Sequence, residues 1–171
     1  MRPGASPVKD GTPFMSYGAI KWLNSFLNKD MSVFEWGSGG STIYITKRVK
    51  KIISIEYDPG YYKFISEYLK KNNLLNYEFI FKKPEDYCSA IGAYPDNFFD
   101  LIIVDGIKRA DCVKYAINKV RLGGYLLLDN SNDPAYASVI LPMLKEWRRE
   151  DFSGPKGYKP YWYQTTIWQK L

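Results

Sequence analysis

The chain has 171 residues, of which 46% are hydrophobic and 25% charged, a balance that is ordinary for one globular domain with a sizeable core. It contains no histidine, which excludes histidine metal ligands, serine–histidine catalytic pairs and imidazole bases. The formal net charge of +6 permits nucleic-acid binding, but the basic residues are scattered in short pairs, a pattern more typical of solvated surface.

The sequence carries no sign of export or membrane insertion. Residues 1–7 lack the apolar core of a signal peptide, and no apolar run reaches membrane-spanning length. Cys88 and Cys112 have neither metal-binding nor redox spacing, so reduced packing thiols are expected. We therefore expect a cytoplasmic protein with no membrane partner, and the sequence leaves its oligomeric state open.

The first half of the chain alternates between helical and strand-like patterns after a loose segment over residues 1–13. Asp58-Pro59 supplies an N-cap and a first-turn proline for one of the helices. The expected elements are a helix that buries Ile20, Leu23, Phe26 and Leu27, a strand at 32–36, a helix at 41–49, a strand at 51–56, a helix that buries Tyr61, Phe64, Ile65, Tyr68 and Leu69, and a strand at 77–81.

The second half continues the alternation. A strand at 98–104 is almost wholly apolar apart from Asp100, as expected for a parallel strand covered on both faces. The later elements are a helix that buries Val113, Ala116, Ile117 and Val120 and stops at Gly123-Gly124, a strand at 125–128, a helix from Asp133-Pro134 to Trp147 kinked by Pro142, and a final strand within 162–170.

Strands that alternate with helices in this way predict a doubly wound, mostly parallel α/β sheet with helices on both faces, Rossmann-like and formed by a single domain over residues 1–171. In such a sheet ligands bind at the carboxyl ends of the strands. No repeat, low-complexity segment or inserted substrate domain is visible in the sequence.

A glycine-dense turn at 37–40 joins the first strand to the helix that follows it. Gly37 and Gly39 can adopt positive φ and let a ligand approach the main chain. Glu56 ends the next strand, 19 residues after Gly37, where a carboxylate can accept hydrogen bonds from two ribose hydroxyls. The plainer alternative is a surface glutamate that closes a strand. Together the loop and the acid predict a site for an adenosine-type cofactor.

The pattern Glu35-x-Gly37-x-Gly39 resembles motif I of the class I S-adenosylmethionine-dependent methyltransferases. Ser41 stands where that family usually has a further glycine, and Thr42 departs from the third glycine of a nicotinamide-type G-x-G-x-x-G motif. The resemblance implies S-adenosylmethionine as cofactor and an acid after the third strand, Glu85 or Asp86, that recognises adenine. The cofactor-binding residues implied are Glu35, Gly37, Ser38, Gly39, Ser41, Thr42, Glu56, Tyr57, Glu85 and Asp105.

Two later strands also end in polar residues, Asp105 and the pair Asp129-Asn130, whose oxygen atoms suit Mg²⁺. This arrangement resembles the metal site of the cation-dependent O-methyltransferases of the catechol and caffeoyl-coenzyme A group. It implies that Asp105, Asp129 and Asn130 bind the ion and that Asp105 and Lys108 are catalytic, with Lys108 as general base. Simple capping by Asp129-Asn130, and a solvated helix start at Lys108, remain the alternatives.

The leading functional hypothesis is therefore an S-adenosylmethionine-dependent methyltransferase that transfers a methyl group to an oxygen of a small-molecule acceptor. One alternative is an RNA methyltransferase or RNA-binding module, for which the basic balance of the chain is the argument. The other is a dinucleotide-dependent oxidoreductase, against which Thr42 argues.

Overall fold

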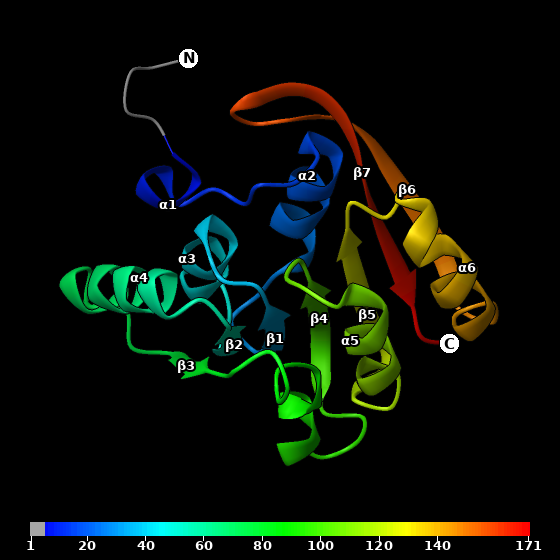
Figure 1. Ribbon diagram of the computed structural model, residues 1–171, viewed down its shortest axis with the longest axis horizontal. Coiled ribbons are helices and arrows are strands. Elements are labelled where there is room, and N and C mark those ends of the chain that lie inside the picture. Colours follow the sequence, from blue (N-terminus) through cyan, green and yellow to red (C-terminus); the bar gives the residue numbers. More distant parts are fainter. Residues whose placement is uncertain (1–5) are drawn as a thin grey trace.

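The computed structural model describes residues 6–171, which form one seven-stranded sheet with helices on both faces (Figure 1). Within these residues, no helix combines the length and the apolar character needed to cross a bilayer. The strands are β1 (Ser32–Trp36), β2 (Lys51–Glu56), β3 (Tyr77–Phe81), β4 (Phe99–Val104), β5 (Val120–Asp129), β6 (Arg148–Lys156) and β7 (Lys159–Gln169). The helices are α1 (Pro7–Asp10), α2 (Tyr17–Phe26), α3 (Gly40–Thr46), α4 (Pro59–Lys71), the 3₁₀ helix η1 (Cys88–Ala93), α5 (Arg109–Ala116) and α6 (Pro134–Met143).

The strand order is β3-β2-β1-β4-β5-β7-β6. The first five strands of this order are parallel, whereas β7 is antiparallel to both β5 and β6. The predicted doubly wound, mostly parallel α/β sheet is therefore confirmed. The order reverses between β1 and β4, and a reversal of this kind leaves a crevice at the carboxyl ends of the strands, where ligands of such sheets bind.

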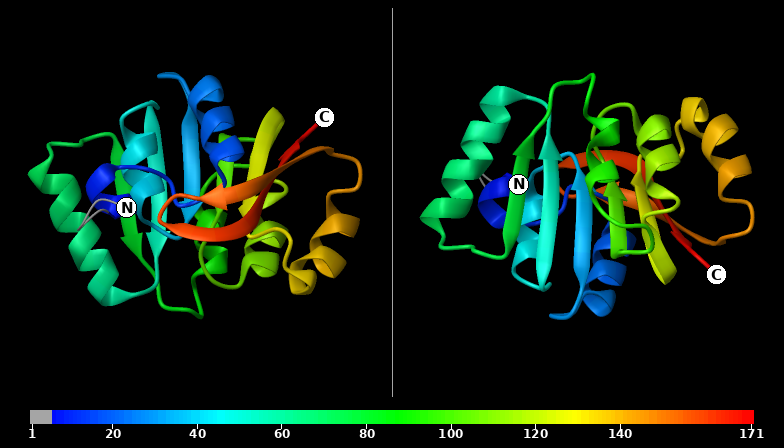
Figure 2. Two further views of the ribbon diagram at one scale, coloured as in Figure 1. Left: turned by 90° about the horizontal axis from the view of Figure 1, so that it is seen from above. Right: turned by 90° about the horizontal axis from the view of Figure 1, so that it is seen from below.

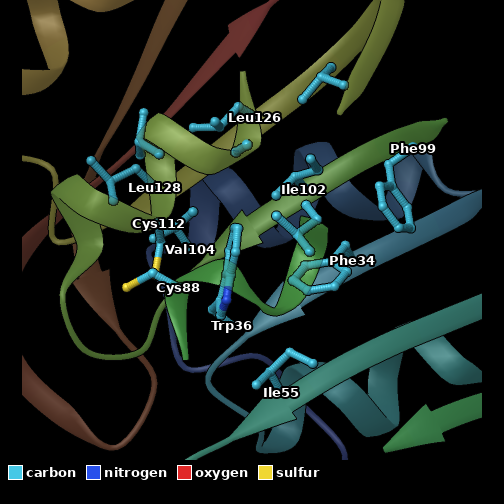
Figure 3. Close-up of a cluster of buried hydrophobic side chains, with 14 of the residues drawn as sticks. Phe34, Trp36, Ile55, Cys88, Phe99, Ile102, Val104, Cys112, Leu126 and Leu128 are labelled. Carbon is cyan, nitrogen blue, oxygen red and sulfur yellow. The ribbon is translucent and has the colours of Figure 1, made fainter. Parts of the chain in front are cut away.

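Successive side chains of the central strands enter two different core layers, because strand side chains alternate between the two faces of a sheet. Phe34 and Trp36 pack in the layer that also holds Cys112 of α5 (Figure 3). Val33 packs in the opposite layer, against residues of α2 and α3 such as Leu23. Coverage on both faces explains why these strands read as nearly continuous apolar runs.

The N-terminal segment is more ordered than expected where the structure describes it. Residues 1–5 of the segment predicted to be loose lie outside the described residues, and Pro7–Asp10 form α1. This segment packs on the start of α3: a Cβ at Gly40 would lie 2.1 Å from the carbonyl oxygen of Thr12 and 2.5 Å from that of Pro7. The N-terminal segment therefore covers the helix that follows the glycine loop. The helix predicted around Ile20, Leu23 and Phe26 is present as α2.

The element before β5 is shorter than predicted. Helix α5 ends at Ala116, and Val120, which was expected on that helix, begins β5. Gly123-Gly124 does not stop a helix but lies inside the strand, beside an irregularity in the β4–β5 register. A Cβ at Gly124 would lie 3.0 Å from the carbonyl oxygen of Asp100, so the glycine permits a close backbone approach.

The C-terminal part contains one strand that the sequence did not predict. Helix α6 ends at Met143, one residue after Pro142, instead of continuing to Trp147. Residues 148–156 then form β6, and the predicted final strand is present as β7 over Lys159–Gln169. The β6–β7 hairpin extends back over α2 toward the N-terminal segment (Figures 1 and 2), where the hydroxyl of Tyr158 donates a hydrogen bond to Asp10.

Candidate functional site

The glycine loop lies against the residue that follows β4. Gly37 has φ +90°, and a Cβ there would lie 2.8 Å from the carbonyl carbon and oxygen of Asp105. Only glycine fits this position without strain. Gly39 instead has φ 166°, which is extended backbone, so the positive φ expected for both glycines is found at Gly37 but not at Gly39.

The acid of the motif, Glu35, is buried behind the loop. Its Oε2 accepts hydrogen bonds from the hydroxyls of Thr42 at 2.5 Å and Ser54 at 2.7 Å. The Thr42 hydroxyl also accepts a hydrogen bond from the N–H of Gly39 at 2.9 Å. Burial raises the pKa of Glu35 to about 7, and its Oε1 has no hydrogen-bond partner among the described residues. Glu35 and Thr42 thus hold the loop from behind.

The second acid, Glu56, connects two loops. Its Oε2 accepts hydrogen bonds from the N–H of Ser38 at 3.1 Å and from the Ser38 hydroxyl at 2.6 Å. Its Oε1 accepts from the N–H groups of Tyr57 at 2.9 Å and Asp58 at 3.0 Å. The acid that ends β2 is therefore in direct contact with the loop that follows β1, although Glu56 comes 18 positions after Ser38 in the sequence.

Two adjoining cavities open where β1, β2 and β4 end. The larger has a volume of about 560 Å³ and the smaller about 250 Å³, and Ser38, Tyr61 and Asp105 line both. The larger is lined by Gly37, Ser38, Glu56, Tyr57, Asp58, Gly60, Tyr61, Phe64, Asp105, Gly106 and Ile107. The smaller is lined by Pro7, Phe14, Ser38, Gly39, Gly40, Ser41, Tyr61 and Asp105.

Most of the predicted cofactor residues line these cavities, but three do not. Glu35 and Thr42 lie behind the loop, and Glu85 lines a third cavity of about 410 Å³. Sequence reasoning also missed Tyr61 and Phe64, which it expected in the core. They are 37% and 47% exposed and line the larger cavity, because α4 begins three residues after β2 ends and its first turns lie beside the end of that strand. Their position just after Glu56 was the available signal.

Lys108, the predicted general base, does not line either of the two cavities that Asp105 borders. Its backbone is left-handed, with φ 50°, and its Nζ donates a hydrogen bond to the carbonyl oxygen of Pro84 at 2.7 Å. Its side chain lines the third cavity together with Glu85, whereas Asp105 lines the other two. The left-handed turn directs the lysine toward the loop after β3.

Arg109 takes the place beside Asp105. Its Nη2 donates a hydrogen bond to Oδ1 of Asp105 at 3.0 Å, and its Nη1 donates to the main-chain oxygen of Asp129. The guanidinium group therefore ties together the ends of β4 and β5. Burial and the neighbouring Asp129 carboxylate raise the pKa of Asp105 well above its ordinary value.

The residues predicted to bind Mg²⁺ do not fit that ion in this arrangement. Oδ2 of Asp129 accepts a hydrogen bond from the ammonium group of Lys156, and Oδ1 of Asn130 accepts another from it at 2.5 Å. Among the described residues, no group of three or more cysteine, aspartate or glutamate side chains is arranged to hold a metal ion. Two strand-end oxygens expected to coordinate Mg²⁺ are instead held by a lysine.

Neither a protein-family model nor a curated protein matches this sequence. Solved structures do match. The tRNA (m1A58) methyltransferase TrmI from Aquifex aeolicus has a TM-score of 0.66 and 20% identity, over 91% of this chain and 67% of TrmI. SMU.1697c from Streptococcus mutans, a candidate methyltransferase in complex with SAH, has a TM-score of 0.66 and 14% identity, over 86% of this chain and 93% of its own.

A third similar structure is the precorrin 8w decarboxylase from Methanobacterium thermoautotrophicum, with a TM-score of 0.68 and 14% identity over 99% of this chain and 93% of that protein. At such identities these likenesses establish the fold alone. The chain has the Rossmann-like fold of the class I S-adenosylmethionine-dependent methyltransferases. A decarboxylase is among the three, so this fold does not by itself determine the reaction.

Proposed function

We propose that this chain is an S-adenosylmethionine-dependent methyltransferase and that residues 1–171 are its single cofactor-binding domain. The observation that carries the proposal is the contact of Ser38 with Glu56, whose Oε2 accepts hydrogen bonds from the N–H and the hydroxyl of Ser38. This contact joins the glycine loop and the second acid in the wall of one cavity of about 560 Å³, a volume in the range of small-molecule sites.

The two cavities suit the two ends of the cofactor, the nucleoside and the methionine. In the larger cavity, a ribose diol can replace the rotatable Ser38 hydroxyl as a hydrogen-bond donor to Glu56, and Tyr57 and Ile107 offer flanking surfaces for the adenine ring. In the smaller cavity, the main chain at 38–41 suits the methionine end of the molecule. Glu85 lines the third cavity, so we assign it no part in adenine recognition.

When bound, S-adenosylmethionine supplies a methyl group on a sulfonium centre for in-line displacement. The protein has to align the acceptor and to remove its proton. Asp105 borders both cavities, and its raised pKa makes its carboxylate a better proton acceptor than an ordinary aspartate. We assign the proton-accepting role to Asp105, with Arg109 holding its carboxylate in place, and assign none to Lys108.

We further propose that the acceptor is an oxygen of a small molecule. Asp105 borders both cavities, so the acceptor meets the methyl group beside it, and the space next to the methionine end in the smaller cavity of about 250 Å³ suits a small molecule. A hydroxyl that reaches Asp105 there meets the carboxylate that can take its proton. No metal ion belongs to this proposal, since Lys156 already holds Asp129 and Asn130.

A second candidate function, methylation of nucleic acid, has separate support. The chain carries a net charge of +6, and Tyr161 and Trp162 on β7 are 65% and 75% exposed. Exposed aromatic rings can stack on unpaired bases. A mobility-shift assay with RNA at increasing salt tests this candidate, because phosphate-driven affinity falls steeply as salt rises. Tight, salt-sensitive binding would favour the nucleic-acid acceptor over the small molecule.

Calorimetry with S-adenosylmethionine, its demethylated product SAH and NAD⁺ tests the main proposal. We expect binding of the first two but not of NAD⁺; binding of NAD⁺ alone would support the oxidoreductase alternative. Glu56→Ala should weaken cofactor binding about tenfold to a hundredfold, because each hydrogen bond to a charged group contributes about 1.5–3 kcal/mol. Glu67→Ala is the matched control, since Glu67 is exposed on α4. If neither cofactor form binds at millimolar concentration, the proposal is wrong.

A further inference from the structure

A buried lysine stands among the oxygen atoms at the end of β5. Lys156 is the last residue of β6, and its side chain is 3% exposed, while that of Asp129 is 1% exposed. The ammonium group donates hydrogen bonds to Oδ2 of Asp129 and to Oδ1 of Asn130. A buried charge needs partners of this kind, because taking it out of water without them is costly.

The fold of the hairpin carries this lysine inward. The register between β6 and β7 shifts between Pro155 and Lys156, and such an irregularity re-aims the side chain at that point. The ammonium group then lies 4.3 Å from the ring centre of Tyr163 and 5.2 Å from that of Phe14. Aromatic faces attract a cation at these distances. Phe14 also lines the smaller cavity, so the lysine lies next to the proposed acceptor side.

We propose that the ammonium group of Lys156 is the built-in cation of this site and takes the place that a divalent cation would need at the strand ends. A bound Mg²⁺ would have to lie 2.0–2.1 Å from its oxygen ligands. The Lys156 nitrogen already occupies the approach to the oxygens of Asp129 and Asn130. Removal of the lysine side chain should therefore open a Mg²⁺ site.

The other oxygen atoms of Asp129 also have hydrogen-bond partners within the protein. Its Oδ1 accepts a hydrogen bond from the Thr165 hydroxyl at 2.8 Å, and its main-chain oxygen accepts one from Arg109. The charges are also balanced, because two carboxylates, Asp105 and Asp129, face two cations, Arg109 and Lys156. A divalent ion added to this group would leave buried positive charge without a partner. Methyl transfer by this protein would accordingly need no divalent cation.

Calorimetric titration with MgCl₂ alone tests the inference, and because no cofactor is present its result is independent of the proposed methyl transfer. Wild-type protein should show no saturable binding at millimolar Mg²⁺. Lys156→Ala should bind Mg²⁺ at least about tenfold more tightly than wild type, and Lys156→Ala/Asp129→Asn should lose that gain. Lys145→Ala is the matched control, because the Lys145 side chain is 73% exposed. It should behave as wild type.

Two results would overturn the inference. One is saturable Mg²⁺ binding to wild type that Asp129→Asn abolishes. The other is a folded Lys156→Ala that binds no Mg²⁺. If the alanine variant does not fold, Lys156→Gln replaces it, because its neutral amide removes the positive charge and can turn its carbonyl oxygen toward a bound ion. Mg²⁺ should then raise the Tm of Lys156→Gln but not that of wild type, and an unchanged Tm in the variant contradicts the built-in cation.

Discussion

The hydroxyl group of Thr42 connects the buried carboxylate of Glu35 to the glycine loop. It donates to Oε2 of Glu35 at 2.5 Å and accepts from the N–H of Gly39 at 2.9 Å. Both Glu35 and Thr42 are fully buried. The threonine that departs from the nicotinamide-type glycine motif is therefore the residue through which the first acid holds the shape of the loop.

Thr42→Val removes this hydroxyl and keeps the shape of the side chain. The change leaves a buried carboxylate and a loop N–H short of a partner, so we expect a loss of about 1–3 kcal/mol in the free energy of unfolding. Urea denaturation measures this loss, and calorimetry with SAH should show weaker binding. Thr42→Ser keeps the hydroxyl and should restore most of both quantities. A valine variant with wild-type stability would contradict the connecting role.

The two glycines of the loop should respond differently to alanine. At Gly37, with φ +90° and a Cβ position 2.8 Å from the Asp105 carbonyl, alanine is expected to destabilise the fold by about 1–3 kcal/mol. At Gly39 the backbone is extended and the nearest atom is the Tyr61 hydroxyl at 3.4 Å, so the fold should tolerate alanine. The added methyl group would lie at the smaller cavity, so Gly39→Ala should weaken SAH binding. Thermal melts and calorimetry separate the two effects.

Gly106 gives a test of packing below the larger cavity. A Cβ at this position would lie 1.9 Å from the Tyr87 hydroxyl, which is buried and has no hydrogen-bond partner among the described residues. Gly106→Ala should therefore cost about 1–3 kcal/mol through overpacking. Tyr87→Phe removes the clashing oxygen and should recover part of that loss. Urea denaturation of the two single variants and the double variant gives their coupling; additive effects would show that the two side chains do not clash.

The sequence predicted the parallel half of the sheet well, because its apolar runs are bounded by clear turn and cap residues. It did not predict β6, whose first four residues, Arg148-Arg149-Glu150-Asp151, are all charged. A charged edge strand exposes its side chains and carries little hydrophobic pattern, which is one way proteins keep sheet edges from pairing with other chains. The glycine pair at 123–124 was predicted to end a helix but lies within β5. A glycine that permits close backbone approach in a strand cannot be told from a glycine that ends a helix by sequence alone.

The candidate site also contains residues whose positions the sequence predicts and residues whose directions it does not. Ser38 follows β1 and Glu56 ends β2, and the carboxyl ends of adjacent parallel strands meet, so their approach could be predicted from strand order alone. The direction of Lys108 depends on one left-handed backbone conformation, and that of Lys156 on a register shift in a hairpin. Neither feature has a periodic signal in the sequence. The predicted metal site finds no support among the residues that the structure describes, because the sequence could not show that the ammonium group of Lys156 lies beside Asp129.

Glu35 should make the stability of the protein depend on pH. Burial raises its pKa from the ordinary 4.5 to about 7 in the folded state, so between these values the folded state binds more protons than the unfolded state. The free energy of unfolding should therefore fall as the pH rises from about 4.5 to about 7, with a contribution on the order of 3 kcal/mol.

Glu35→Gln removes the titrating group and should remove this contribution. The decisive quantity is the change in the free energy of unfolding between pH 4.5 and pH 7, compared between wild type and variant, because other titrating groups contribute equally to both. Urea denaturation at the two pH values measures it. The absolute stability of the glutamine variant is not the test, since its amide cannot reproduce every hydrogen bond of the acid. An equal pH dependence in the two proteins would mean that Glu35 has its ordinary pKa in the folded state as well, and that its burial behind the loop does not keep it protonated.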